Sequence, residues 1–137
     1  MRSFRGLARR GTSAAARLER GSVSVQMVIL MPAMFAVMFL GLQAALVYHA
    51  RTLAIASAQE GARAAGAETG TTMTGIRAAQ GYLTATAGDT LIKTSVSGHR
   101  SATSATVTVT GRALSVLPGW HPAVSQSATV PVERITR

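Results

Sequence analysis

The longest run of apolar positions lies near the start of the chain. Residues 21–48 hold no charged side chain, and within them residues 23–48 read VSVQMVILMPAMFAVMFLGLQAALVY. At about 1.5 Å per residue, a helix of this stretch is roughly 39 Å long, whereas the hydrocarbon core of a bilayer is about 30 Å thick. Its Leu, Ile, Val and Phe side chains contribute about −4 to −7 kcal/mol to membrane insertion, which Gln26, Pro32 and Gln43 partly offset. The pattern predicts one transmembrane helix.

A cleaved secretory signal peptide is the main alternative for this stretch. The apolar core of a signal peptide is about 7–15 residues long and is followed by an Ala-x-Ala site. Such sites occur at Ala54-Ile55-Ala56 and at Ala56-Ser57-Ala58. The apolar run is longer than a signal peptide requires, so the sequence favours a signal-anchor that stays in the membrane.

The residues after the apolar run favour a continuing helix with one smooth face. Residues 49–67 are rich in alanine and lack proline, so the helix is expected to continue to about Glu68, with Gly70 near its end. Small residues recur every four positions, which places them on one helix face where another helix can approach closely. An alanine-rich helix also repeats small residues by composition alone. The predicted helix-packing residues are Gly41, Ala45, Ala54, Ala58, Ala62 and Gly66.

The remaining sequence has the pattern of a small helix followed by a sheet. Thr74 is expected to cap a second helix, in which Ile76 to Ala87 repeat apolar residues at helical spacing. Apolar and polar residues then alternate, which is typical of half-buried strands. In the first strand, Ile92, Thr94 and Val96 are expected to share a face. The three expected strands cover residues 92–96, 105–110 and 124–132, with a loose hairpin loop at 97–104 and with Pro131 marking an edge strand or a strand end.

The predicted fold class is α+β, with a long N-terminal transmembrane helix that continues outside the membrane. A second short helix and a small antiparallel sheet of about three strands complete it. The expected divisions are a basic cytosolic leader at 1–21, a transmembrane and extended helix at 22–68, and a small exported α+β domain at 69–137.

Charge is distributed unevenly along the chain and indicates an orientation. Residues 1–20 contain six arginines and one acid, Glu19, so five of the nine formal net positive charges precede the apolar run. Basic residues beside a membrane helix favour the cytosolic side. The N-terminus is therefore expected in the cytosol and the C-terminus outside the cell membrane. Nucleic acid is not expected as a partner, because the aromatic content of 4% is too low for a base-stacking surface.

The chain offers few groups for chemistry. It has no cysteine, which excludes disulfides, thiolate nucleophiles and thiolate metal sites. His49, His99 and His121 do not have the spacing of a metal site, and no serine lies in a nucleophile motif. The sequence therefore predicts no enzyme, no cofactor and no metal.

Several segments resemble a known family. Residues 20–26, Arg-Gly-Ser-Val-Ser-Val-Gln, followed by an apolar run, resemble the processing site of type IV prepilins and of TadE-like pseudopilins. Residues 59–65, Gln-Glu-Gly-Ala-Arg-Ala-Ala, look like the "AxEGARAA" segment of the TadE-like family. The later segments 107–111, 117–119 and 128–133 resemble the C-terminal part of its members.

The resemblance implies a processing step. In these families a prepilin peptidase cuts after a glycine on the cytosolic face, which makes Gly21 the last leader residue and Ser22 the first mature residue. The fifth mature position is acidic in the families, and here it is Gln26, which keeps the shape but lacks the charge. That departure puts in doubt the pairing of a carboxylate with a neighbour's N-terminus during assembly.

Two functions from different classes follow. The resemblance implies a minor pseudopilin-like structural component of a tight-adherence (Flp/type IV-like) pilus or related secretion assembly. Its implied partners are membrane lipid, other pilin or pseudopilin subunits and pilus assembly proteins. The alternative is a single-pass membrane-anchored exported binding domain that does not enter a filament.

Overall fold

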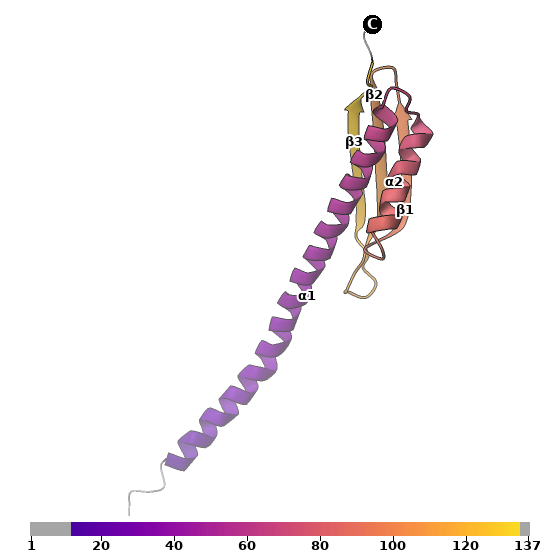
Figure 1. The fold of residues 1–137 in the computed structure, drawn as a ribbon. Helices are drawn as coiled ribbons and strands as arrows, with labels where there is room; N and C mark the ends of the chain where they lie inside the picture. Colours follow the sequence, from indigo (N-terminus) through magenta and orange to yellow (C-terminus); the bar gives the residue numbers. More distant parts are fainter. Residues whose placement is uncertain (1–11, 135–137) are drawn as a thin grey trace, which may run out of the picture. The chain divides into compact units, whose positions relative to one another are not determined.

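The structure, a computed structural model, describes residues 12–134, and within the first helix it describes side chains from residue 25 onward. It confirms the α+β class, with a long N-terminal apolar helix, a second helix and a three-stranded antiparallel sheet (Figure 1). The elements are α1 (Thr12–Gly66), α2 (Thr72–Thr86), β1 (Leu91–Arg100), β2 (Ser104–Ala113) and β3 (Ala123–Pro131). Residues 1–11 of the predicted leader lie outside the described residues.

The chain forms two compact units that meet within α1. The first ends at Leu40, and the second, called the domain below, runs from Gly41 to Arg137. The sequence-based boundary after residue 68 follows the end of the helix. The compact domain reaches further back, because the last part of α1 supplies much of its core.

The sheet has the order β1–β2–β3, and both strand pairs are antiparallel. In the central strand, Val107 pairs with Gly98 of β1 and with Ala128 of β3. Pro131 is the last residue of the edge strand β3, which confirms the role expected for a residue that has no N–H to donate to a ladder.

The hairpin between β1 and β2 is longer than the sequence pattern indicated. Residues 97–100 belong to β1, and only 101–103 form the turn. The Ser101 hydroxyl closes this turn by accepting hydrogen bonds from the backbone N–H groups of Thr103 and Ser104. The prediction of a loop over 97–104 was therefore wrong, because polar strand residues on a solvated face resemble loop residues in sequence.

A bulge in β1 also changes which residues face the core. The pairing register with β2 shifts between Ile92 and Ser95, and Lys93 has a φ of 51°, in the left-handed region. An extra residue on one strand breaks the alternation of faces. Leu91, opposite the buried Ala113, and Val96, opposite the buried Val109, consequently point toward the core. Thr94 lines the groove beside α2, whereas Ile92, opposite the exposed Arg112, faces away from the core. The prediction that Ile92 shares a face with Val96 was therefore wrong.

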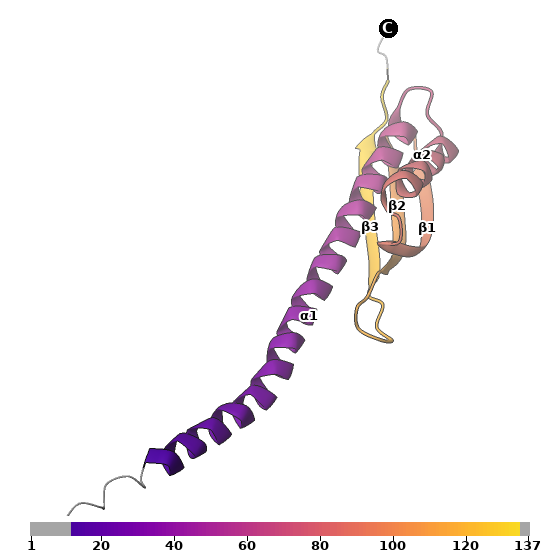
Figure 2. The same cartoon turned by 60° about the horizontal axis from the view of Figure 1, so that its bottom comes forward.

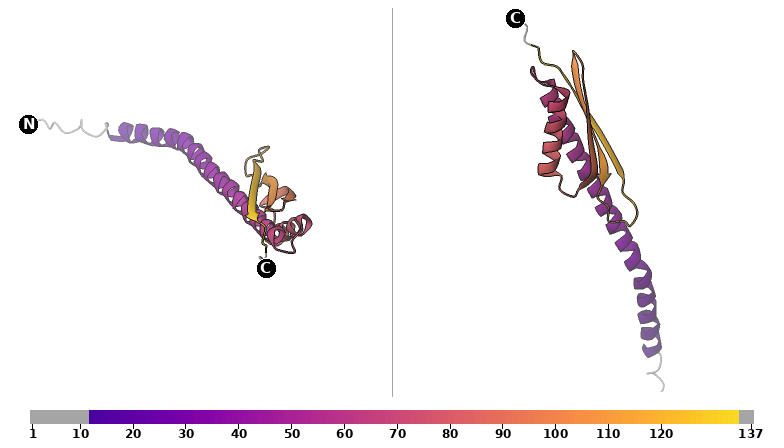
Figure 3. Two further views of the ribbon diagram at one scale, coloured as in Figure 1. Left: turned by 90° about the horizontal axis from the view of Figure 1, so that it is seen from above. Right: turned by 90° about the vertical axis from the view of Figure 1, so that its right-hand side faces the viewer.

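Within the domain, α2 and the C-terminal part of α1 cover the same face of the sheet. The views in Figures 2 and 3 agree on this two-layer arrangement and show the other sheet face without a covering element. The inward residues of the central strand, Ala105, Val107 and Val109, are fully buried.

The buried surface of α1 consists almost entirely of small residues. They allow the helix to lie close to the sheet, where Val107, Val109 and Val124 fill the space between the layers. Small side chains bury little apolar area each, so the stability of this contact depends on close packing. The buried residues of α1 in the domain are Gln43, Ala50, Leu53, Ala54, Ser57, Ala58, Gly61, Ala62, Ala65 and Gly66.

The two helices cross at a pair of glycines. A Cβ atom on Gly61 would lie 2.7 Å from the carbonyl oxygen of Gly75, and one on Gly75 would lie 2.6 Å from the Cβ of Ala65. Next to the crossing, the buried Ser57 hydroxyl donates a hydrogen bond to the carbonyl oxygen of Ala79 at 2.9 Å. The crossing therefore has no room for a side chain at either glycine.

The start of α2 is capped one residue before the helix begins. The Thr71 hydroxyl accepts a hydrogen bond from the backbone N–H of Thr74 at 3.1 Å. Thr71 is thus the N-cap, and the prediction that Thr74 has this role was wrong. Both threonines precede the apolar repeat, and the sequence pattern alone did not distinguish them.

The end of α1 is capped by residues distant in sequence. Arg100 Nε donates to the carbonyl oxygen of Ala65 at 2.7 Å, and the backbone N–H of Glu133 donates to that of Gly66 at 2.9 Å. The last carbonyl groups of a helix have no partner within the helix, and a guanidinium also favours the negative end of the helix dipole. β1 and the segment after β3 therefore fix the end of α1.

Two glycines of α2 provide a matched test of the helix crossing. We expect Gly75→Ala to destabilise the domain by about 1–3 kcal/mol through overpacking. We expect Gly81→Ala to stabilise it by up to about 1 kcal/mol, because alanine is the better helix former and no atom lies within 4 Å of its Cβ. Urea unfolding of the full chain in detergent, followed by circular dichroism, measures both changes. Equal stabilities for the two variants would contradict this account of the crossing.

Candidate functional site

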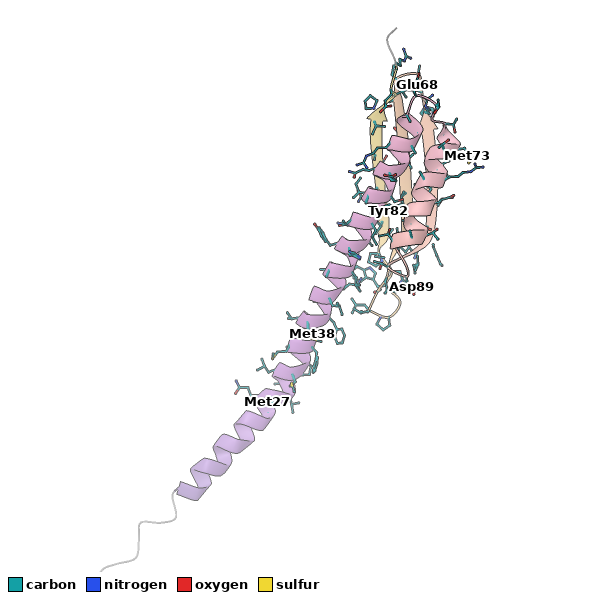
Figure 4. All side chains as sticks on the ribbon, viewed as in Figure 1. Met27, Met38, Glu68, Met73, Tyr82 and Asp89 are labelled. Carbon is teal, nitrogen blue, oxygen red and sulfur yellow. The ribbon has the colours of Figure 1, made fainter. Side chains whose placement is uncertain are left out.

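The most prominent surface outside the domain core is an apolar helix face without protein cover. All residues from 25 to 42 of α1 are exposed, and the large apolar side chains among them are between 42% and 73% accessible. Figure 4 shows Met27 and Met38 projecting away from the helix axis. Among the described residues, this is the one helix long and apolar enough to cross a membrane. Such a surface requires lipid or other apolar helices around it.

The exposed apolar stretch ends at a buried glutamine. Gln43 is 2% exposed, and its Oε1 accepts hydrogen bonds from Ser115 Oγ and from the backbone N–H of Val116, both at 2.9 Å. Its Nε2 donates to the carbonyl oxygen of Leu114 at 3.4 Å. One side chain of α1 thus holds three consecutive residues of the connection between β2 and β3.

The sequence interpretation treated Gln43 only as a cost within an apolar span reaching residue 48. In the structure the continuously exposed apolar surface ends earlier, at Leu42, because Gln43 is buried and Val47 packs against the domain core. The exposed apolar part that the structure describes, residues 25–42, is about 27 Å long as a helix, which is close to the hydrocarbon thickness of about 30 Å. A lone polar residue near the end of an apolar run was the signal that could have indicated this boundary.

The predicted helix-packing residues have two different surroundings. Gly41 and Ala45 are exposed, and a Cβ on Gly41 would have no atom within 4 Å. The other four, Ala54, Ala58, Ala62 and Gly66, are buried by the domain itself. The sequence interpretation expected neighbouring helices to approach this part of the face. In the structure, α2 and the sheet of the same chain occupy it, because a single turn and a hairpin bring them back alongside α1.

The predicted processing residues are only partly described. Gly21 and Ser22 lie in the helical part of α1 whose side chains the structure does not describe. Gln26 is exposed on the apolar helix. Cleavage between Gly21 and Ser22 therefore stays a prediction.

The segment 59–65 divides into an inward and an outward face. Gly61, Ala62 and Ala65 are buried, and Gly61 forms the helix crossing described above. Glu60 and Arg63 point outward and form an exposed ion pair at 3.4 Å. An exposed pair of this kind contributes little to stability, typically about 0.2–1 kcal/mol. The inward residues of this segment serve packing.

The uncovered face of the sheet is a regular array of hydroxyl groups. Thr106 and Thr129 are paired across strands with their hydroxyl oxygens 2.8 Å apart, and the Thr108 hydroxyl donates to that of Ser127 at 3.1 Å. The array comprises Ser95, Ser97, Thr106, Thr108, Thr110, Ser125, Ser127 and Thr129, as the strand registers require.

Other features of the domain provide little for catalysis or cofactor binding. Within residues 12–134 as described, no three His, Asp or Glu side chains gather in a way that could hold a metal ion. A shallow groove of about 390 Å³ lies between α2 and β1. Its lining residues are Gln80, Leu83, Thr84, Ala87, Gly88, Leu91 and Thr94, none of which is charged.

The comparison with protein families finds a similarity in the N-terminal part of the chain. The family model described as "TadE-like protein" matches residues 21–63, which confirms the resemblance over this range. The range begins at the predicted processing junction, includes the exposed apolar helix and ends within segment 59–65. No curated protein and no solved structure matches the chain. The resemblance of residues 107–133 to the same family stays a prediction.

Replacing Gln43 with leucine tests its role as the tie between α1 and the loop. Gln43→Leu leaves the Val116 N–H and the Leu114 carbonyl without this partner, at a cost of about 1–3 kcal/mol. We expect roughly 5- to 150-fold faster chymotrypsin cleavage within residues 114–122, because cleavage follows the population of the opened loop. Gln59→Leu, at an exposed position of the same helix, should leave the rate unchanged. Equal rates for both variants would exclude this role for Gln43.

Proposed function

From the TadE-like match and the uncovered apolar helix within it, we propose that this chain is a pseudopilin-like subunit. It serves as a minor structural component of a tight-adherence (Flp) pilus or a related secretion assembly. The observation that carries the proposal is the coincidence of the matched range, residues 21–63, with two features of α1. One is the exposed apolar stretch, and the other is the small-residue surface that holds the domain.

The membrane is the first environment that this helix requires. Residues 23–42 fit the hydrocarbon thickness, and the six leader arginines favour a cytosolic N-terminus. In this arrangement the domain lies on the outer side of the cell membrane. The proposed partners at this stage are lipid and a prepilin peptidase that cuts between Gly21 and Ser22.

A filament is the second environment. Removing the apolar stretch from lipid forfeits a substantial part of its insertion energy, and only other apolar helices can offset that loss. Pilin or pseudopilin subunits supply such helices. Of the predicted helix-packing residues, Gly41 and Ala45 are the two that the chain's own domain leaves exposed, so a neighbouring helix can approach closely there.

The second candidate is a membrane-anchored exported domain that binds an envelope partner and stays outside any filament. The hydroxyl array on the uncovered sheet face favours this candidate. It offers many hydrogen-bonding groups on a flat surface, which suits a polar ligand such as a glycan or a peptide. In this case α1 serves only as an anchor, and its exposed small residues contact lipid.

Processing is tested by the masses and N-termini of protein recovered from membranes. We expect the wild-type chain to start at Ser22, having lost 21 residues and the net charge of +5 that six arginines and Glu19 give residues 1–21. Gly21→Val should leave the full-length precursor, since the peptidase needs the small residue at the cut. Gln26→Glu is the control and should be cut like wild type. Identical masses for wild type and Gly21→Val would argue against processing at this junction.

Assembly is tested by single-cysteine cross-linking, for which the natural absence of cysteine is well suited. In cells with the complete assembly machinery, Ala45→Cys should form disulfide-linked species with cysteine-bearing pilin subunits. Ala56→Cys, also small and on the same helix but half-buried within the domain, should not. Gel mobility with mass spectrometry identifies the products. If Ala45→Cys stays monomeric while the processed chain accumulates in the membrane, the anchored binding domain is the better reading.

A further inference from the structure

The connection between β2 and β3 exposes apolar and aromatic side chains at one end of the domain. Trp120 is 51% exposed and Leu114 is 38% exposed, and Leu117 between them is half-buried. Residues 114–122 contain no Lys, Arg, Asp or Glu. The outer face of the sheet carries hydroxyl groups that suit water, whereas this loop exposes apolar and aromatic side chains and no charge. Exposed apolar groups of this kind commonly mark a surface that contacts a membrane or another protein.

The loop is fixed in position, and Gln43 fixes it at the end of the apolar helix. Besides the hydrogen bonds of Gln43, the backbone N–H of Leu114 donates to Thr90 O at 3.1 Å, and that of Ala113 donates to Pro122 O at 2.9 Å. Gln43 directly follows Leu42, the last residue of the continuously exposed apolar stretch. Residues 114–116 of the loop are therefore held where this stretch ends.

The charged side chains at the loop end of the domain include more basic than acidic groups. At the end that carries the loop, the charged side chains next to it are Arg112 and Lys93 on the sheet and Asp89 before β1. Figure 4 shows Asp89 at this end and Glu68 at the opposite end, where Arg100, Glu133 and Arg134 also lie by strand order. Basic residues close to a bilayer are attracted by anionic headgroups.

We propose that the loop of residues 114–122 is a membrane-interface anchor, with Trp120 in the headgroup region of the outer leaflet. The inference rests on the proposed function, because it requires that residues 23–42 span the membrane. Tryptophan prefers this interface, where its ring meets apolar chains and its N–H meets water. Tyr48, which is 74% exposed on α1 just after Gln43, adds a second aromatic side chain at this level. The domain then rests on the bilayer surface.

The single tryptophan of the chain reports its own surroundings. The full chain is reconstituted at low density in phosphatidylcholine vesicles, with or without bromine on the acyl chains near the headgroup. We expect blue-shifted Trp120 emission that falls by about half or more with brominated lipid and is little affected by aqueous iodide, as for an interfacial indole. The control carries Trp120→Phe and Met73→Trp, which places the tryptophan at an exposed position at the opposite end of the domain. Its emission should be quenched by iodide and unaffected by bromine.

Flotation of the vesicles at alkaline pH separates the two ways in which the inference can fail. If the chain floats with the vesicles but Trp120 is quenched by iodide and unaffected by bromine, the loop is not an anchor, although the membrane span stands. If the chain does not float, the span itself is contradicted and the loop anchor with it. Bromine quenching that appears only at high protein density, where subunits touch, also overturns the inference in favour of contact between copies.

Discussion

The close approach of α1 to α2 and the sheet is the interaction on which the domain depends. It requires residues with almost no side chain at the crossing, Gly61 and Gly75, and alanines on either side. Because each of these residues buries little apolar area, the contact gains stability only when it is nearly free of voids. The end of α1 is also joined to the end of β1, because Arg100 donates a hydrogen bond to the carbonyl oxygen of Ala65.

The two parts of α1 have different surroundings: one part is exposed and apolar, and the other packs within the domain. Gln43 lies at the boundary between them. Before this residue α1 is apolar and uncovered, and after it the buried face is small and covered by the same chain. A buried amide is costly unless it finds hydrogen-bond partners, and both the oxygen and the nitrogen of the Gln43 amide have one or more. The glutamine therefore positions the loop after β2 against the helix at the residue where the apolar surface stops.

The sequence was sufficient for the parts of the fold that follow periodicity. The apolar run, the alanine-rich continuation and the alternation around Val107 and Val109 predicted the elements and their class correctly. The bulge at Lys93 was not predictable, because a left-handed residue in a strand leaves no trace in the hydrophobic pattern. The small-residue face at Ala58 and Ala62 was recognised, but its partner was not. The spacing of small residues in the sequence indicates that a helix has a smooth face. Whether that face packs against the same chain or against another one depends on how the later elements fold back, which the spacing does not show.

The most direct test of the two-environment helix is a spin-label scan along α1. Single cysteines can be introduced from position 30 to position 60 without removing any native cysteine. In bilayers, labels up to Leu42 should be accessible to oxygen on every face and protected from a water-soluble nickel complex. From Gln43 onward, protection from both agents should recur about every 3.6 residues, at Ala50, Ala54 and Ala58. Uniform oxygen accessibility that continues past Ala50 without this period, or nickel accessibility before Leu42, would contradict the account.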